Sequence, residues 1–314
     1  MKKYKNSKIF LAGHNGLVGS TIYRKLKLKG FKKILVKNRN ELDLKNSVKV
    51  LNFLKKNNPD YIIIAAAKVG GIKANNDLSG QFIFENLCIQ NNLIDGAYKI
   101  GVKKLIFLGS SCIYPRLSKQ PIKEKYLLDG PLEKTNEAYS IAKIAGVKMC
   151  EYYNKQYSTN FLSLMPCNTF GKNDNYDLDS SHFLPALIKK LYQSKIKKKK
   201  SVELWGNGKT LREVIYVEDI ANAVIHFLFT RTNHNLINIG TEKEMSIEDY
   251  AKLIMKILDF KIRIKYINKT LTGTPRKILD CSLAKSYNWS ANISIQDGLK
   301  ETIADFKKNY KKYS

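Results

Sequence analysis

Residues 8–19 read KIFLAGHNGLVG, and this stretch decides the fold. Its apolar part, Lys8 to Ala12, predicts a buried strand, and the amphipathic segment Leu17 to Lys29 predicts a helix. A glycine run of the form G-x-x-G-x-x-G joins the two. A strand, a glycine-rich turn and a helix in this order are typical of the sheet edge that binds the pyrophosphate of a dinucleotide. The alternative interpretation is a glycine-rich turn without a ligand.

Each glycine of the run has a physical use in such a turn. Gly13 allows the tight turn after the strand, and Gly19 allows the helix to pack closely on the sheet. Gly16 lets backbone N–H groups at the helix N-terminus approach a phosphate. The position of the run, between a first strand and a first helix, is what makes the pattern specific.

Short apolar runs alternate with longer amphipathic stretches over the first part of the chain. The strand-like runs are Lys8 to Ala12, Ile34 to Lys37, Tyr61 to Ala67, Leu105 to Gly109 and Phe161 to Met165. Such alternation is typical of βαβ units, and the continuously apolar third run fits a strand buried on both faces. We predict an α/β fold, a Rossmann-type doubly wound parallel sheet with a smaller C-terminal α/β substrate lobe.

The pattern becomes irregular after residue 170. A loop-like stretch over 171–181 and a lysine run at 197–200 indicate a smaller second lobe, which the segment Val214 to Thr230 interrupts. The predicted dinucleotide-binding domain comprises 1–170 and 211–237, and the predicted substrate lobe comprises 171–210 and 238–314.

The composition fits a folded protein with a basic surface. The chain has 314 residues, 44% of them hydrophobic and 26% charged, which excludes a disordered chain. It carries 55 Lys and Arg against 27 Asp and Glu, so its net charge of +28 favours anionic partners. Nucleic-acid-binding modules interleave basic residues with aromatic ones, and the sequence around the lysine runs matches no such module. We attribute these runs to codon bias and a solvated surface, and predict no nucleic-acid partner.

The apolar runs predict no membrane span, because all are far shorter than the ~20 residues that a spanning helix needs. The first residues lack the apolar region of a signal peptide, so we expect a cytoplasmic protein. The five cysteines include no C-x-x-C pair, which predicts reduced thiols and no metal site.

The residues after the second predicted strand distinguish two cofactors. About twenty residues past Gly19, the NAD form of this fold places an acid that binds the ribose 2′-hydroxyl. Asn38 and Arg39 stand there instead. An arginine pairs with a 2′-phosphate through charge-assisted hydrogen bonds, so the sequence favours NADP over NAD. The alternative is an exposed arginine with no ligand.

Tyr139 and Lys143 have the Y-x-x-x-K spacing, which places both side chains on one face of a helix predicted over Asn136 to Tyr157. The same spacing occurs twice near the N-terminus, so the spacing alone does not identify a catalytic pair, and its position in the predicted fold must do so. This pair follows a strand that ends in Gly109-Ser110-Ser111-Cys112, beside the expected cofactor. We expect the lysine ammonium to lower the pKa of the phenol, so that the tyrosine exchanges a proton with a carbonyl oxygen.

Several blocks together resemble the extended short-chain dehydrogenases/reductases that act on nucleotide sugars. These blocks are Gly13 to Gly19, 109–111, Tyr139 to Lys143, 166–168 and 212–219. More narrowly, the chain resembles the GDP-L-fucose synthase family in AAAKVGGI at 65–72, GSSCIYP at 109–115 and GTPRK at 273–277. The resemblance covers essentially the whole chain.

The resemblance implies a bifunctional enzyme that epimerises GDP-4-keto-6-deoxy-mannose at C3 and C5 and then reduces it with NADPH at C4. Both protons are α to the C4 ketone, so one enolate oxygen, stabilised by Ser110 and Tyr139, serves both reactions. The resemblance makes Cys112 and His182 the additional base and acid. It also implies that Lys143 binds the nicotinamide ribose. The alternatives are a buried small cysteine and a surface or capping histidine.

The resemblance also implies the binding residues. The cofactor-binding positions are Gly13, Asn15, Gly16, Leu17, Val18, Gly19, Arg39, Asp43, Leu44, Leu108, Gly109, Lys143, Pro166, Cys167, Asn168, Thr169 and His182. The substrate-binding positions are Lys190, Trp205, Arg212 and Thr272. The basic side chains in this second set offer charge to the diphosphate, and the indole offers an aromatic face.

The chain departs from the family pattern at four positions. Asn15 and Lys190 stand where arginine is usual, Phe170 replaces a tyrosine, and Thr272 replaces an acid. These changes leave open a C4 reductase with little or no epimerase activity, acting on another GDP-4-keto sugar such as a deoxyhexose or heptose in surface-polysaccharide biosynthesis. A third alternative is a redox-sensing or RNA-associating protein that binds NADP, against which the intact catalytic set argues.

The resemblance finally suggests a homodimer. The helices that would pair are predicted over Phe82 to Ile100 and Glu137 to Tyr157.

Overall fold

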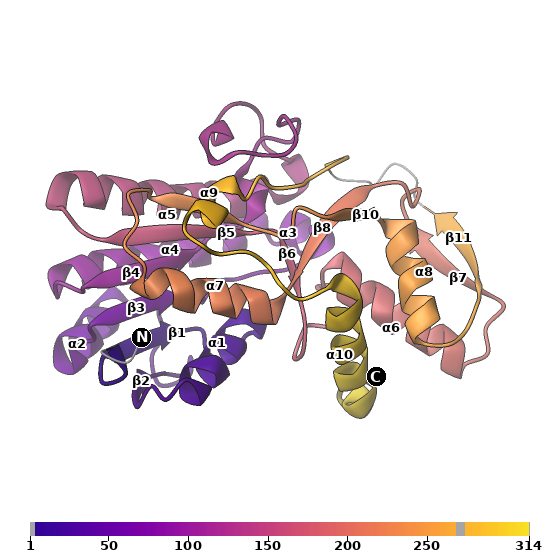
Figure 1. Cartoon of the computed structure of the whole chain (residues 1–314), viewed down its shortest axis with the longest axis horizontal. Coiled ribbons are helices and arrows are strands. Elements are labelled where there is room, and N and C mark those ends of the chain that lie inside the picture. The colour runs from indigo at the N-terminus through magenta and orange to yellow at the C-terminus, as the bar shows by residue number, and fades with distance from the viewer. Residues whose placement is uncertain (1–3, 268–273, 314) are drawn as a thin grey trace.

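The computed structural model describes residues 4–267 and 274–313. A six-stranded parallel sheet forms the larger lobe, with the order β2-β1-β3-β4-β5-β9 (Figure 1). Its strands are β1 (Lys8–Ala12), β2 (Lys33–Leu35), β3 (Tyr61–Ile64), β4 (Lys104–Leu108), β5 (Phe161–Pro166) and β9 (Leu236–Ile239). The order runs outward from β1 in both directions, as in a doubly wound sheet. The predicted fold class is confirmed.

Helices cover both faces of this sheet. The helices of the larger lobe are α1 (Leu17–Leu28), α2 (Ser47–Asn57), α3 (Ile72–Asp77), α4 (Ser79–Lys99), α5 (Glu137–Tyr157) and α7 (Val217–Phe229). Gly146 of α5 lies against the Phe107 ring, whereas Leu108 faces Ile220 and Val224 of α7. Because neighbouring strand residues point to opposite faces, α5 and α7 lie on opposite sides of the sheet.

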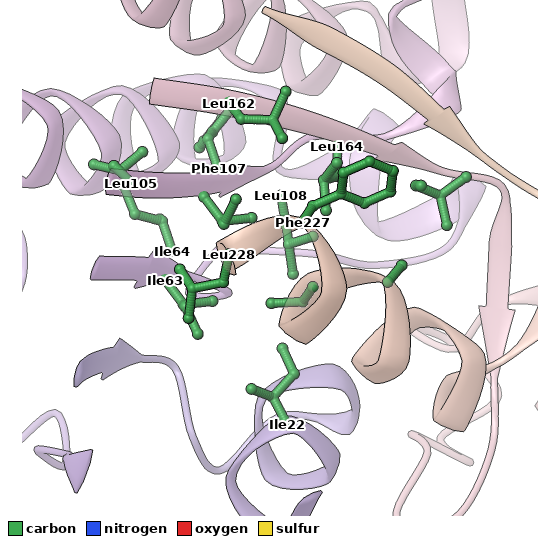
Figure 2. Close-up of a cluster of buried hydrophobic side chains, with 14 of the residues drawn as sticks. Ile22, Ile63, Ile64, Leu105, Phe107, Leu108, Leu162, Leu164, Phe227 and Leu228 are labelled. Atoms are coloured by element: carbon green, nitrogen blue, oxygen red, sulfur yellow. The ribbon is translucent and has the colours of Figure 1, made fainter. Parts of the chain in front are cut away.

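The core of the larger lobe fills the space between sheet and helices. Figure 2 shows Phe227 of α7 near Leu108 and Leu164, with Ile22 of α1 below them and pointing toward the same core. Leu108 and Leu164 are register partners in the parallel pair of β4 and β5. The parallel register brings the carboxyl ends of the strands to one sheet edge, where ligands bind in open α/β sheets.

The smaller lobe contains two small sheets (Figure 1). Strands β6 (Asn168–Phe170), β8 (Leu211–Tyr216) and β10 (Glu244–Ser246) form one, and β7 (Ser201–Trp205) and β11 (Arg263–Ile267) form the other. Its helices are α6 (Phe183–Ile196), α8 (Ile247–Ile257) and α10 (Ile295–Lys308), followed by the short α11 (Tyr310–Tyr313). They pack around a second buried cluster that includes Tyr250, Ile254 and Phe306.

The chain crosses between the lobes several times. Phe170 and Val214 belong to the buried cluster of the smaller lobe. Leu279, Ala284 of the short helix α9 (Ser282–Ser286) and Trp289 instead pack with the larger cluster, although the predicted boundaries put them in the substrate lobe. The division into two domains stays a prediction, and these contacts favour boundaries that give the larger lobe the segment 279–289.

All five cysteines are free. Within the described ranges, the structure holds no group of three or more His, Cys, Asp or Glu side chains placed to bind a metal ion. No helix in those ranges is long and apolar enough to span a bilayer.

Candidate active site

The glycine turn after β1 has the geometry that its sequence predicts. Gly13 has φ +92°, and a Cβ there would lie 2.5 Å from the backbone nitrogen of Ala66. A Cβ at Gly19 would collide with the Gly13 carbonyl oxygen. These two glycines are therefore required by the fold itself, whether or not a ligand binds.

Gly16 differs, because a Cβ there would meet nothing nearer than a carbonyl oxygen at 3.7 Å. It is exposed and forms the N-cap of α1, where no side chain caps the helix. The first-turn N–H groups, at Leu17 and Val18, thus have no side-chain acceptor at the positive end of the helix dipole. This arrangement fits a diphosphate.

The predicted 2′-phosphate residues lie on the surface beside this turn. The Asn15 side chain donates a hydrogen bond to the Asn38 side chain at 2.8 Å. The Arg39 side chain is 70% exposed and lies 3.7 Å from the Glu85 carboxylate. A contact this long and exposed leaves the guanidinium able to turn toward a phosphate.

Two predicted cofactor positions follow on the same loop. Asp43 accepts a hydrogen bond from the Lys45 N–H at 3.1 Å, and the Leu44 carbonyl accepts one from Asn92 of α4 at 2.9 Å. These contacts fix the loop that follows β2.

Lys143 is buried beneath Tyr139. Its ammonium donates to the Leu108 carbonyl at the end of β4, 2.9 Å away, and only 3% of the residue is exposed. Nζ lies 5.9 Å from the Tyr139 ring centre. Burial lowers the pKa of Lys143 to about 7.

The structure corrects the expected direction of the Tyr139 pKa. Burial and the neighbouring Cys112 raise this pKa, while a hydrogen bond with Ser110 lowers it less. The expected lowering by Lys143 is wrong, because the lysine is buried so deeply that it is only partly charged at neutral pH. Tyr139 consequently stays protonated at neutral pH and has a proton to donate.

Cys112 lies in a 3₁₀ turn, Ser111–Ile113, directly after β4. Its N–H donates to the Ser110 hydroxyl at 3.2 Å, and its carbonyl accepts from Ser140 of α5. Burial opposes a charge here, but Lys277, Ser110 and Arg212 together lower the pKa of the thiol. The Cys112 thiol therefore loses its proton more readily than an ordinary cysteine.

His182 is the N-cap residue of α6 and makes no side-chain capping bond. It is accessible to solvent, yet desolvation by the surrounding protein and the charge of Lys277 lower the pKa of its imidazole. The capping alternative is therefore not what the geometry shows. His182 and Cys112 share the same neighbouring cation, Lys277.

The ends of β4 and β5 supply the remaining predicted cofactor positions. Gly109 donates to the Leu164 carbonyl and Cys167 donates to the Ile239 carbonyl, so both lie at the carboxyl edge of the sheet. Pro166 and Cys167 lead into β6, where Asn168 donates to the Glu213 carbonyl at 2.9 Å.

Thr169 donates to the Cys167 carbonyl at 3.3 Å and is half-buried. Its contact is local, so it fixes the bend between β5 and β6.

The predicted substrate residues fall into two places. Lys190 of α6 lies over the Trp205 ring at 5.4 Å, and both are accessible from solvent on the smaller lobe. Arg212 of β8 instead lies in the charged surroundings of Cys112, and burial lowers its pKa to about 10. Thr272 lies outside the described residues.

Two residues that sequence reasoning did not single out belong to this region. Lys277 donates to Cys112 across 165 positions of sequence. Buried Glu213 accepts N–H groups from Thr241, Glu242 and Leu279 at 2.6 to 2.8 Å, and so ties β8 to two other segments. Both stand in blocks that carry the family resemblance, which was the available signal.

Comparisons with known proteins agree with this geometry. The model of the NAD dependent epimerase/dehydratase family matches residues 9–240. GDP-L-fucose synthase 1 of Arabidopsis thaliana is 45% identical over 305 residues, which cover 97% of this chain and 94% of that protein.

Two solved structures share the whole fold. One is MlghC, a GDP-mannoheptose C4 reductase from Campylobacter jejuni with NADP bound, which is 37% identical with a TM-score of 0.87 over 96% of this chain and 99% of that one. The other is a GDP-6-OMe-4-keto-L-xylo-heptose reductase from C. jejuni, which is 35% identical with a TM-score of 0.90 over 97% and 99%.

Proposed function

Because this chain belongs to the GDP-L-fucose synthase family, within the NAD-dependent epimerases/dehydratases, we propose that it epimerises a GDP-4-keto-6-deoxy-mannose at C3 and C5 and reduces it at C4 with NADPH. The observation that carries the proposal is that the pKa values of two neighbouring side chains are shifted in opposite directions. Tyr139 is held protonated, and the surroundings of Cys112 lower the pKa of its thiol. One site thereby contains a proton donor for a ketone oxygen and a base for an α-proton.

In the proposed reduction, Tyr139 and Ser110 receive the C4 carbonyl oxygen. The Tyr139 hydroxyl donates its proton to that oxygen as the carbonyl becomes an alcohol. Lys143, whose ammonium donates to the Leu108 carbonyl, is the residue we assign to the nicotinamide ribose. NADPH, when bound, supplies the hydride. The first turn of α1 and Arg39 are assigned to its diphosphate and 2′-phosphate.

In the proposed epimerisation, the Cys112 sulfur takes a proton from the carbon next to the ketone. The carbon–hydrogen electron pair moves to the C4 oxygen, where the same two hydroxyl groups stabilise the enolate. His182 returns a proton to the opposite face of the carbon. Its solvent-accessible position suits this role, since it can be reprotonated from water.

The GDP part of the substrate is assigned to the second lobe. The exposed Trp205 face suits a base or sugar, and Lys190, held over that face, suits the diphosphate. A lysine keeps the charge of the usual arginine and loses its bidentate fork. Arg212 would meet the phosphate nearest the sugar, because it lies beside the catalytic thiol.

A C4 reductase without epimerase activity is the second candidate. It is favoured by the similarity to two C. jejuni proteins whose names describe reduction of GDP-heptose sugars. The test is NADPH oxidation with a panel of GDP-4-keto hexoses and heptoses, with NMR analysis of each product. Turnover of the 6-deoxyhexose with inversion at C3 and C5 supports the first candidate, and heptose reduction with retained configuration supports the second.

We also propose a homodimer through α4 and α5. Phe84 of α4 and Ile141 and Tyr152 of α5 are 63%, 44% and 56% exposed, which is unusual for large apolar side chains on one helix pair. Sedimentation velocity should give a dimer for the wild type and a monomer for Phe84→Glu. A monomeric wild type at micromolar concentration would contradict this arrangement.

The cytoplasmic location stays a prediction.

A further inference from the structure

Lys277 reaches Cys112 from a distant part of the sequence. Its ammonium nitrogen lies 3.4 Å from the Cys112 sulfur, with both side chains partly buried. A cation at this distance favours the thiolate over the thiol, and partial burial strengthens the attraction by excluding water. The contact is thus a specific electrostatic pair at the reacting sulfur.

The backbone next to Lys277 is fixed. The Ile278 N–H donates to the Gln120 side chain at 2.9 Å, and the Leu279 N–H donates to the buried Glu213 carboxylate at 2.8 Å. These bonds hold the chain within two residues of Lys277. The lysine therefore extends from a fixed segment toward the sulfur, unlike a surface lysine whose side chain samples many positions.

Other charged and titratable groups also face the thiol. Arg212 of β8 adds a second positive charge, and Tyr139 of α5 is a neutral phenol at neutral pH. Lys277 also acts on His182, whose pKa falls through desolvation by the surrounding protein and through this charge. The same cation thus favours loss of the Cys112 proton, and it lowers the fraction of His182 that carries the proton to be returned.

We propose that Lys277 is a positioning residue for epimerisation, whose ammonium holds Cys112 as the thiolate that removes the proton next to the ketone. The inference rests on the proposed function and adds a residue to it. In the step, a sulfur–hydrogen bond forms, the carbon–hydrogen bond breaks, and its electron pair moves to the C4 oxygen. Cys112 is thereby the base, and His182 is the group that returns the proton.

The first test needs no substrate. The rate of iodoacetamide alkylation at Cys112 is measured against pH, by mass spectrometry of the peptide that contains it. Lys277→Met removes the charge at similar length and should raise the midpoint of this profile by about 1 to 3 pH units. Lys277→Arg keeps the charge and should restore most of the wild-type profile.

Arg276→Met is the matched control, since it removes a cation one residue away that pairs with Glu244. Its alkylation midpoint should equal that of the wild type. Binding of NADP by every variant checks that each one folds. An unchanged midpoint in Lys277→Met, or an equal rise in Lys277→Arg, would overturn the inference.

The second test measures exchange of deuterium from D₂O into C3 and C5 of a GDP-4-keto-6-deoxy sugar. Lys277→Met should slow exchange at least tenfold near neutral pH and recover when the pH exceeds its raised midpoint. Loss of exchange with no recovery at high pH would contradict the electrostatic role. If the alkylation midpoint shifts but the wild type shows no exchange, the proposed epimerase activity fails, and the role of Lys277 in epimerisation fails with it.

Discussion

The two halves of the candidate site are built differently. The α5 half, Ser110, Tyr139 and Lys143, stands on the end of β4 and on one face of a long helix. The loop half consists of Cys112, His182 and Lys277. These residues come from a 3₁₀ turn, a helix N-terminus and the segment 274–281. Burial dominates the pKa shifts of the first half, whereas in the second half the charge of Lys277 adds to desolvation at His182 and opposes it at Cys112.

This difference separates the chemistry of two neighbouring groups. Burial keeps the Tyr139 phenol protonated, whereas nearby cations favour the Cys112 thiolate. Groups whose surroundings push their pKa values apart are natural partners as acid and base. The α5 half should therefore control reduction, and the loop half should control epimerisation.

The largest expected effect is on reduction. Tyr139→Phe removes the proton donor and leaves the glycine turn intact, so it should slow single-turnover NADPH oxidation by about 10²–10⁴-fold while NADPH still binds. Tyr157→Phe, a partly exposed tyrosine at the end of the same helix, is the control. A Tyr139→Phe rate within about threefold of wild type is too small a loss for a general acid and would remove the tyrosine from this role.

The loop half should respond independently. Cys112→Ser should reduce deuterium exchange at C3 and C5 by about 10²-fold or more, because serine does not ionise near neutral pH. Hydride transfer should continue and give a C4-reduced sugar of the original configuration. Cys88→Ser, on α4, serves as the control. Equal loss of exchange and reduction in Cys112→Ser would mean that the two halves do not act separately.

Cofactor preference should change less. One charge-assisted hydrogen bond contributes about 1.5–3 kcal/mol, or roughly 10- to 150-fold. Because Asn15 offers no charge, Arg39→Ala should reduce the ratio of kcat/KM for NADPH over NADH by a factor in the lower half of that range. The exposed Arg231→Ala should leave the ratio unchanged. A wild type that uses both cofactors equally would exclude Arg39 as the residue that recognises the 2′-phosphate.

The smallest effect concerns stability. The pKa of Lys143 is about 7 in the folded protein and about 10.4 in the unfolded chain, so the unfolded chain binds more protons between these values. The cost of burying the charge is therefore largest below pH 7 and disappears as the pH rises toward 10. Lys143→Met should raise the free energy of unfolding by about 1–2 kcal/mol at pH 6.

Denaturant unfolding of wild type and Lys143→Met at several pH values checks this. The difference should shrink steadily between pH 7 and 10. A difference that does not depend on pH would show that the lysine is not buried as a charge.

The α5 half and the glycine turn could be predicted from sequence because their signals are local. The spacing of Tyr139 and Lys143 follows from one helix, and Gly13 and Gly19 are separated by a single turn. The direction of the Tyr139 pKa could not be predicted, since spacing gives the distance between two groups and says nothing of their burial.

The loop half shows the opposite limit. The contact between Lys277 and Cys112 joins residues 165 positions apart. The Glu213 carboxylate likewise accepts N–H groups from residues 28, 29 and 66 positions later in the chain, which no local pattern connects. The family resemblance drew attention to both blocks but gave neither residue a role. Only the folded chain brings their side chains together.

The most direct test is one NMR experiment in D₂O on the wild-type enzyme, with GDP-4-keto-6-deoxy-mannose and unlabelled NADPH. The two-half account predicts a product with deuterium at C3 and C5, inverted configuration at both carbons, and a hydrogen from the cofactor at C4. A C4-reduced product with no deuterium at C3 or C5 and with its original configuration would contradict the account and leave a C4 reductase alone.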